Sequence, residues 1–474
     1  MTLATVIVGA SIGGVRTAQA LRSAGYQGEI TLVGDESALP YDRPPLSKGL
    51  LAGTATPESI TLLTQPQAAD LGIRLLLGRA ARHLDVAGSF VQLGDGERLR
   101  YDDLVVATGA RPRPSPWGKP AGVHYVRTLG DAAALRDDLA RGGPLVIIGA
   151  GFIGAEVAAT ARQLGVGEVT LIDPAPVPMG RVIDPDTAAR LGARHREHGV
   201  DTRFGTGVEA IEPTGGGLLI RLADGSALAA ATVVVGIGAV ANDEWLASSA
   251  LPVGGGLRCD ERCRAEGAPR VHAVGDVARW LHAGYGTLVR AEHWTNAVDQ
   301  ARYVAADIVR PGEQGPYQPV EYVWSDQYDA RIQVTGRTGA DLRPVTLERA
   351  GQPGSFAVLY ASPEGALAGA VTVSWPKAAV TARRAIKVGT PLDEAQAAIL
   401  SRDMRRSPHP DDDAPGAARR SRAGPAVRGR PPALALRARL RAEDLPALPR
   451  HPADPRLADR LRRPEPGDPV REGI

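Results

Sequence analysis

Two glycine-rich loops in the sequence have the residue types and spacing of nucleotide-binding turns. The first reads Gly9-Ala10-Ser11-Ile12-Gly13-Gly14, and the second reads Gly149-Ala150-Gly151-Phe152-Ile153-Gly154. In such a turn the first glycine makes a tight bend, a small residue lets the backbone approach a pyrophosphate, and the last glycine lets the helix pack on the strand. The helix N-terminus adds the positive end of its dipole. One copy is a weak signal, because unrelated α/β proteins share it, but two copies predict two dinucleotide sites.

An acidic residue follows each loop at the place where a ribose would lie. Asp35 comes 26 residues after Gly9, and Asp173 comes 24 residues after Gly149. A carboxylate at this position accepts hydrogen bonds from ribose hydroxyls. The charge of Asp173 would repel a 2′-phosphate, which favours NADH over NADPH. Arg181 lies nearby and weakens this preference, because a contact with a phosphate and a solvated surface position are equally good interpretations of this arginine.

The residues around each loop predict the strand–helix–strand order that would position it. Apolar, β-rich runs alternate with helical patterns, as a doubly wound parallel sheet requires. The sequence therefore predicts an α/β fold with two Rossmann-like dinucleotide-binding units. The expected elements are a strand to Val8, a helix over 14–24 and a strand over 30–33, then a strand over 145–148, a helix to 164 with Glu156 on its first turn, and a strand over 169–172.

The composition limits both the chemistry and the partners. A formal net charge of +2 over 474 residues gives no global signal for nucleic acid or an anionic membrane as the main partner. The two cysteines, Cys259 and Cys263, exclude a disulfide framework and every four-cysteine metal or iron–sulfur site, so we expect no metal centre. Redox chemistry would then require a bound organic cofactor.

No segment of the sequence has the pattern of a leader peptide or a membrane span. Met1 leads directly into the apolar stretch Ala4–Val8, without a basic segment and a cleavage site. The longest apolar run, residues 145–161, contains Glu156, whereas a lipid-spanning helix needs about 20 apolar residues. We therefore expect no membrane segment and a cytoplasmic protein.

The C-terminal stretch differs in composition from the rest of the chain. Residues 407–474 hold 13 Pro and 14 Arg but no Lys, Asn, Gln, Thr, Phe, Tyr, Trp, Cys or Met. Such a composition does not easily build a core, so we expect a disordered tail over 404–474. Three interpretations stay open: a linker or arm, a basic partner-binding segment, or the product of a shifted reading frame in GC-rich DNA. The sharp loss of aromatic residues favours the third.

Six further motifs accompany the two loops in a fixed order. They are Tyr41-Asp42-Arg43-Pro44-Pro45-Leu46-Ser47-Lys48, Ala107-Thr108-Gly109, Gly236-Ile237-Gly238, Ala273-Val274-Gly275-Asp276, Glu292-His293-Trp294-Thr295-Asn296-Ala297 and Trp324-Ser325-Asp326-Gln327-Tyr328. Together with the loops, they closely resemble the bacterial NADH-dependent ferredoxin reductases of the pyridine nucleotide-disulfide oxidoreductase superfamily, over about residues 3–403. The departures are small: Ser11 replaces a glycine, and Ala241 replaces the usual proline before Asn242.

The resemblance implies a glutathione-reductase-like division into domains. From about residue 320 to 390 the sequence itself changes to short alternating strands joined by Gly and Pro turns, which predicts a third, α+β domain. In the family this domain caps the flavin side. The expected segments are 1–112, the first part of an FAD-binding domain; 113–237, an NADH-binding domain; 238–318, the second part of the FAD-binding domain; 319–403, a C-terminal reductase domain; and 404–474, the tail.

The resemblance also implies FAD and NADH as cofactors and assigns roles to individual residues. Asp35 and Glu36 would hold the adenosine ribose of FAD, and Asp276 would bind the ribityl hydroxyls. Trp294, at the start of a helix, would offer its backbone N–H and the helix dipole to the flavin pyrimidine edge, where negative charge develops on reduction. Further cofactor contacts are implied at Arg43, Lys48, Ala81, Thr108, Gly109, Arg127 and Gly238, and in the second loop with Asp173 and Arg181.

Lys48 is one of only four lysines in a chain with 51 arginines. A compact ammonium can sit near the flavin N5 and pair with a carboxylate better than a broad guanidinium can. In the family's arrangement the partner is Glu156, beside the nicotinamide, so we expect Lys48 and Glu156 to form the catalytic pair. The alternative is an ordinary surface lysine and a glutamate that favours the helix dipole.

The activity implied by the resemblance is that of an FAD-dependent NADH:ferredoxin oxidoreductase. Hydride would pass from NADH to FAD, and electrons would go singly to a small [2Fe–2S] ferredoxin that serves a monooxygenase or a dioxygenase. Reduction of a quinone or an ascorbate radical stays open, as does redox signalling like that of apoptosis-inducing factor. Disulfide reductases are excluded, because their cysteine pair would lie where this chain has residues 43–48. Cys259 and Cys263 are expected to be unpaired thiols, and His293 a structural or site-shaping residue.

Overall fold

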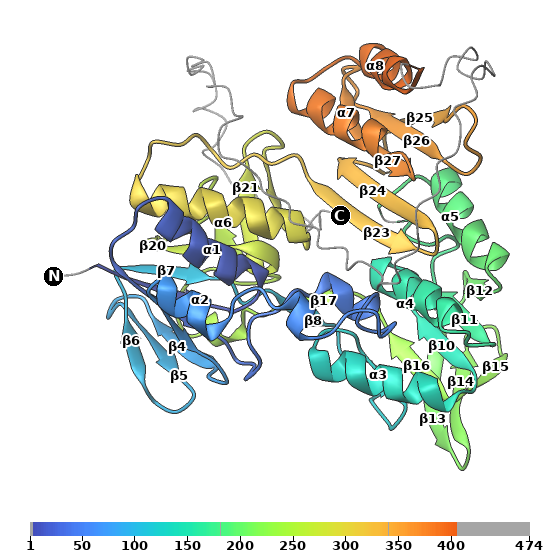
Figure 1. The fold of residues 1–474 in the computed structure, drawn as a ribbon, viewed down its shortest axis with the longest axis horizontal. Coiled ribbons are helices and arrows are strands. Elements are labelled where there is room, and N and C mark those ends of the chain that lie inside the picture. Colours follow the sequence, from blue (N-terminus) through green and yellow to red (C-terminus); the bar gives the residue numbers. More distant parts are fainter. Residues whose placement is uncertain (1–2, 181, 340, 405–474) are drawn as a thin grey trace, which may run out of the picture. The chain divides into compact units, whose positions relative to one another are not determined.

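The computed structural model of the chain describes residues 3–180, 182–339 and 341–404 (Figure 1). The tail expected from residue 404 falls outside these ranges apart from Met404, and the prediction for Arg181 also lies outside them. None of the helices within the described residues has the length and hydropathy needed to cross a membrane.

A nine-stranded sheet carries the first glycine loop. Its parallel centre consists of β7 (Asp103–Val106), β1 (Ala4–Val8) and β2 (Glu29–Val33). Helix α1 (Ile12–Ser23) packs on β1 and β2, and α6 (Trp294–Val309) packs on α1 (Figure 1). The sheet joins two stretches that are separated in sequence by the second loop. Its other strands are β3 (Ile73–Leu76), β18 (Leu257–Cys259), β19 (Arg264–Ala265), β20 (Ala268–Ala273), β21 (Ala278–His282) and β22 (Thr287–Val289).

A five-stranded parallel sheet carries the second glycine loop. Its central strand, β10 (Leu145–Ile148), is fully buried, as expected for an apolar strand between parallel neighbours. Helix α4 (Phe152–Gln163) leaves the loop and packs back on β10 and β11. The other elements of this region are β12 (Asp201–Phe204), β11 (Val169–Asp173), β16 (Thr232–Val235), β9 (Val123–His124), α3 (Leu129–Arg141) and α5 (Pro185–Glu197).

The last described region is an antiparallel sheet covered by two helices. Its order is β23 (Tyr322–Gln327), β24 (Ala330–Gly336), β27 (Leu367–Val373), β26 (Phe356–Ala361) and β25 (Arg343–Glu348), and α7 (Pro376–Lys387) and α8 (Leu392–Met404) follow (Figure 1). The remaining elements are η1 (Pro44–Ser47), η2 (Glu58–Ile60), α2 (Gln65–Asp70), β4 (Ala81–Asp85), β5 (Phe90–Leu93), β6 (Arg98–Arg100), β8 (Ala110–Pro112), β13 (Val208–Thr214), β14 (Gly217–Leu222), β15 (Ala227–Ala230), β17 (Ala239–Ala241), η3 (Glu244–Leu246) and η4 (Gly275–Val277).

The predicted fold class is confirmed: two parallel-sheet Rossmann-like regions are followed by an antiparallel α+β region. Two details were wrong. The first helix begins at Ile12, not at residue 14, and Glu156 is the fifth residue of α4, beyond its first turn. Both errors have one cause. Each helix begins directly after the third residue of its loop, Ser11 or Gly151, so the last glycine of the loop, Gly14 or Gly154, lies inside the helix.

Helix α5 packs against the C-terminal sheet through a buried histidine. Leu191 of α5 shares an apolar cluster with Ile332 and Val358 of the sheet. His195 Nδ1 is 2.8 Å from the Tyr328 hydroxyl, and the two groups hydrogen bond. Burial lowers the pKa of His195 from its ordinary 6.5 to about 4. The imidazole is therefore neutral in the folded chain at neutral pH.

We expect this contact to weaken in acid. Because the folded-state pKa of His195 lies below the unfolded value, its stabilisation is complete above pH 6.5 and is lost as the pH falls towards about 4. The loss should reach about 3 kcal/mol in the free energy of unfolding. Thermal unfolding between pH 7 and 4 should show a shallower pH dependence for His195→Gln than for the wild type. His198→Gln is the matched control, because His198 stacks on the same Tyr328 ring but is 35% exposed. Equal slopes for all three proteins would contradict the assignment.

Candidate functional site

The first glycine loop forms a turn that only glycine permits at two positions. Gly9 has a φ of +118°, and a Cβ atom there would lie 2.1 Å from the carbonyl oxygen of Ala107. A Cβ atom on Gly14 would lie 1.9 Å from the carbonyl oxygen of Gly9. The loop therefore lies directly on β7 and delivers the N-terminus of α1, with Ser11 as its N-cap, to the carboxyl end of the sheet.

A cleft opens over this loop at the ends of β1, β2 and β7. A phosphate cradle, a helix N-terminus and an acid after the second strand converge there, and this donor set suits the adenosine diphosphate half of a dinucleotide. The expected FAD-binding residues that line this cleft therefore fit such a group. The cleft is lined by Gly9, Ala10, Ser11, Gly34, Asp35, Glu36, Ala38, Leu39, Pro40, Tyr41, Arg43, Ala107, Thr108, Gly109 and Arg127.

Two arginines of the cleft are held in place by neighbouring groups. Arg43 donates to Glu36 at 2.7 Å and to the backbone carbonyl of Arg127. Glu36 is thus an anchor for Arg43, and its expected ribose contact stays a prediction. The Arg127 guanidinium lies 3.7 Å from the Asp276 carboxylate, and burial lowers the pKa of Arg127. A half-buried cation in the lining of the cleft suits an anionic ligand.

The second loop repeats the geometry of the first. A Cβ atom on Gly149 would lie 2.3 Å from the carbonyl oxygen of Gly236. A Cβ atom on Gly154 would lie 2.0 Å from the carbonyl oxygen of Gly149. A Cβ atom on Gly151 would meet nothing within 4 Å, so this position faces open space. Asp173 is tied beneath the loop, since its carboxylate accepts from the backbone N–H groups of Ala150 at 2.7 Å and Ala175 at 2.8 Å.

Lys48 and Glu156 meet between the two loops. Lys48 Nζ lies 2.7 Å from Glu156 Oε2, and the Glu156 side chain is only 3% exposed. Ser47 Oγ donates to the same oxygen at 2.6 Å, and Thr160, one turn further along α4, donates to the Ser47 carbonyl at 2.8 Å. The structure therefore brings together two residues 108 positions apart in the sequence, in an ion pair between a buried carboxylate and a half-buried ammonium.

Trp294 begins α6, as expected, and is fixed from two sides. Its indole Nε1 donates to Asp42 Oδ1 at 2.7 Å, and its ring packs edge-on against Trp324 with 5.9 Å between centroids. Burial raises the pKa of Asp42, and the bond from Trp294 opposes that shift. The side chain of Trp294 is thus occupied, which leaves its backbone N–H at the helix N-terminus available to a ligand.

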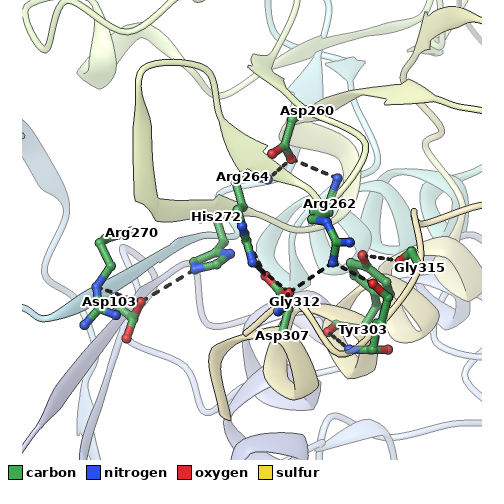
Figure 2. A network of polar contacts seen from close by, with 11 residues as sticks. Asp103, Asp260, Arg262, Arg264, Arg270, His272, Tyr303, Asp307, Gly312 and Gly315 are labelled. Atoms are coloured by element: carbon green, nitrogen blue, oxygen red, sulfur yellow. Dashed lines mark hydrogen bonds and ion pairs between the residues drawn. The ribbon is translucent and has the colours of Figure 1, made fainter. Parts of the chain in front are cut away.

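A polar network anchors the opposite end of α6 (Figure 2). Asp307, in the last turn, has a fully buried side chain and accepts two hydrogen bonds at 2.8 Å from Arg264. Arg262 lies 3.8 Å from the same carboxylate (Figure 2). Because α6 is held at this end, the position of Trp294 at the other end is fixed relative to the nine-stranded sheet.

Comparison with known proteins identifies the family. Residues 3–301 match the pyridine nucleotide-disulphide oxidoreductase model, and residues 322–407 match the reductase C-terminal model. The chain belongs to the pyridine nucleotide-disulphide oxidoreductase family. It is 38% identical to rhodocoxin reductase of Rhodococcus erythropolis over 407 residues, which cover 85% of this chain and 94% of the relative. It is 39% identical to the p-cumate 2,3-dioxygenase system ferredoxin–NAD(+) reductase component of Pseudomonas putida, over 82% of this chain and 94% of the relative.

Solved structures agree with this assignment. Putidaredoxin reductase, in a covalent complex with putidaredoxin, matches with a TM-score of 0.79 and 35% identity over 85% of this chain and 98% of that chain. A ferredoxin reductase from Rhodopseudomonas palustris matches with a TM-score of 0.79 and 34% identity over 85% and 99%. The resemblance stated from the motifs is thereby confirmed.

The chain has no cysteine at residues 43–48, where the sequence comparison placed the cysteine pair of disulfide reductases. Cys259 and Cys263 are both buried and free, and burial raises the pKa of each thiol. His293 is also buried, which lowers its pKa to about 4 and keeps the imidazole neutral at neutral pH. Neither the thiols nor the histidine is suited to proton or electron transfer near neutral pH.

Two of the predicted cofactor contacts stay predictions, and two residues with contacts in the structure were given no role from the sequence. Ala81 begins β4, pairs with Leu93 and is absent from the cleft lining, so its adenine contact stays a prediction. Gly238 lies between β16 and β17 with a φ of +107°, and its cofactor contact also stays a prediction. Asp42 and Ser325 received no role from the sequence, although both stand in the quoted motifs, and Ser325 donates to Glu156 at 2.8 Å.

Proposed function

We propose that this chain is an NADH-dependent reductase that passes electrons through FAD to a small [2Fe–2S] ferredoxin, which supplies a monooxygenase or dioxygenase. The family makes the chain an oxidoreductase with FAD and NADH as cofactors. The observation that carries the proposal is the ion pair between Lys48 and the buried Glu156, on the helix that leaves the second loop, in a chain without a thiol at residues 43–48. Similarity to reductase components of oxygenase systems over most of both chains supports the acceptor. A cytoplasmic location, where NADH is available, is part of this proposal.

The residues of the chain would act by alignment and charge. When bound, FAD would supply the chemistry that takes a hydride from NADH and passes its two electrons one at a time to the acceptor. The first loop with Asp35, Arg43 and Arg127 would hold FAD, and the second loop with Asp173 would hold NADH. Lys48, fixed by Glu156, would present an ammonium beside the flavin N5, and the backbone N–H of Trp294 would face the pyrimidine edge, where negative charge grows on reduction. His293 and the thiols have no part in this reaction.

The test follows anaerobic stopped-flow absorbance of the purified protein mixed with NADH and then with NADPH. Next comes steady-state reduction of a bacterial [2Fe–2S] ferredoxin. We expect a yellow protein that NADH bleaches quickly and NADPH slowly, and that reduces the ferredoxin. Fast bleaching without ferredoxin reduction would reject the acceptor, and the quinone or ascorbate radical would be assayed in its place. A colourless protein that no added FAD restores would reject the proposal altogether.

A further inference from the structure

The Glu156 carboxylate receives donors from two separate regions of the chain. Oε2 lies 2.6 Å from Ser47 Oγ and 2.7 Å from Lys48 Nζ, on and just after η1. Oε1 accepts a hydrogen bond of 2.8 Å from Ser325 Oγ, on β23 of the C-terminal sheet. Glu156 itself belongs to α4, beside the second loop. Each oxygen of the buried carboxylate is therefore bonded to a different part of the fold.

The hydroxyl of Ser325 has a fixed direction. Gln327 lies two residues further on the same face of β23, and its Nε2 donates to Ser325 Oγ at 3.2 Å. Because the oxygen of Ser325 receives this bond, its proton is free to point at Glu156. Ser325 is 0% exposed and Gln327 is 1% exposed, so water does not compete for either bond. A buried donor of this kind orients its acceptor more strictly than solvent would.

The position of the Lys48 ammonium depends on how the Glu156 carboxylate is oriented. The Lys48 side chain is 21% exposed, and its Nζ also lies 3.3 Å from the Pro44 carbonyl oxygen. Its long stem permits several positions, so the ammonium stays where the carboxylate holds it. A carboxylate bonded at one oxygen alone could still turn about its terminal bond, because that torsion is broad. The bond from Ser325 to the other oxygen prevents this rotation.

We propose that Ser325 is a positioning residue for the Lys48–Glu156 pair, so that the C-terminal sheet helps to fix the reactive ammonium. The inference rests on the proposed function, in which Lys48 lies beside the flavin. Ser325 acts through Glu156 and supplies no group to the reaction itself. Its contribution is the hydroxyl alone, which makes the hydroxyl the feature to test.

The first test measures the position of Lys48 without measuring activity. The purified holoprotein is treated with a limiting amine-acetylating reagent, and the acetylation rate of each lysine is followed by mass spectrometry. Lys119, Lys377 and Lys387 serve as internal references in the same sample. Ser325→Ala should label Lys48 about tenfold faster than the wild type, in line with the loss of one buried hydrogen bond to a charged group. Ser325→Thr keeps the hydroxyl and should label at the wild-type rate.

A matched control comes from the same sheet. Thr372 on β27 is 1% exposed, and its hydroxyl has no hydrogen-bond partner among the described residues. Thr372→Val removes a buried hydroxyl of the same sheet that touches no part of the pair, so Lys48 should label at the wild-type rate. If Thr372→Val accelerates labelling as much as Ser325→Ala does, the effect comes from a general destabilisation of the C-terminal sheet, and the positioning role of Ser325 is wrong. An unchanged rate in Ser325→Ala would reject it as well.

The second test separates this inference from the proposed function. Stopped-flow reduction of Ser325→Ala should show a limiting rate about tenfold lower, with the NADH concentration at half-saturation and the bound FAD unchanged. Glu156→Gln is measured alongside. If Glu156→Gln reduces its flavin at the wild-type rate, the role of the pair in the reaction fails, while lysine labelling still reports on positioning. If Glu156→Gln is slow but Ser325→Ala is not, only the positioning role fails.

Discussion

Lys48→Met should slow the reduction of bound flavin by NADH about 100-fold, because it removes the cation expected beside the flavin N5, where the hydride would arrive. The substitution keeps the length of the side chain and leaves the glycine loops untouched. It also leaves Glu156, 3% exposed, with hydroxyl donors but without the counter-ion that lies 2.7 Å away in the wild type. The free energy of unfolding should therefore fall by about 3 kcal/mol. Stopped-flow absorbance and denaturant unfolding measure the two effects on the same preparation.

The double variant Lys48→Met/Glu156→Gln separates these two effects. The neutral amide that Glu156→Gln introduces can accept one of the two serine hydroxyl protons through its oxygen and can donate its NH₂ group to the hydroxyl oxygen of the other serine, so no charge remains buried without a partner. Stability should return to within about 1 kcal/mol of the wild type, while flavin reduction stays slow. If the double variant recovers the rate together with the stability, Lys48 has a structural role only. A rate for Lys48→Met within about twofold of the wild type would lead to the same conclusion.

The elements that the sequence predicted well depend on short-range patterns. A buried strand, a glycine turn and a helix lie within about 20 residues of one another, and both loops match this local order. The helix starts were misplaced because glycine disfavours a helix, so a sequence pattern assigns a glycine in the first turn to the preceding loop. Gly14 and Gly154 nevertheless lie within their helices, where a Cβ atom on either residue would collide with the carbonyl oxygen of the first glycine of its loop.

The contacts that complete the site could not be predicted, because they join distant parts of the chain. Ser325 and Glu156 are 169 residues apart, and Trp294 and Asp42 are 252 residues apart. No periodicity in the sequence encodes such a distance. The Lys48–Glu156 pair was anticipated only because the motifs resembled a family in which the two residues meet. The serine and the aspartate stood in the same motifs, but a hydroxyl or carboxylate in a motif does not reveal its acceptor or donor until the fold is known.

The second loop offers a test in which two glycines three residues apart should respond in opposite ways. Gly151→Val should leave the protein folded and its FAD bound, since a Cβ atom there meets nothing within 4 Å. The added side chain would instead occupy the space that the pyrophosphate of NADH needs, and we expect the concentration of NADH at half-saturation to rise about 30-fold, equivalent to about 2 kcal/mol. Stopped-flow titration with NADH gives this value, and flavin absorbance gives the FAD content.

Gly154→Val should fail at an earlier step, because its Cβ atom would lie 2.0 Å from the carbonyl oxygen of Gly149 and force α4 away from β10. Overpacking of this kind costs more than about 3 kcal/mol, so little folded protein should be recovered. Ser11 of the first loop shows that a small side chain is tolerated at the position equivalent to Gly151, and Gly151→Ser should accordingly weaken NADH binding only about threefold. A folded Gly151→Val protein with unchanged NADH binding would mean that the nucleotide does not lie over this loop. Loss of FAD in the same variant would mean that the two loops do not serve separate nucleotides.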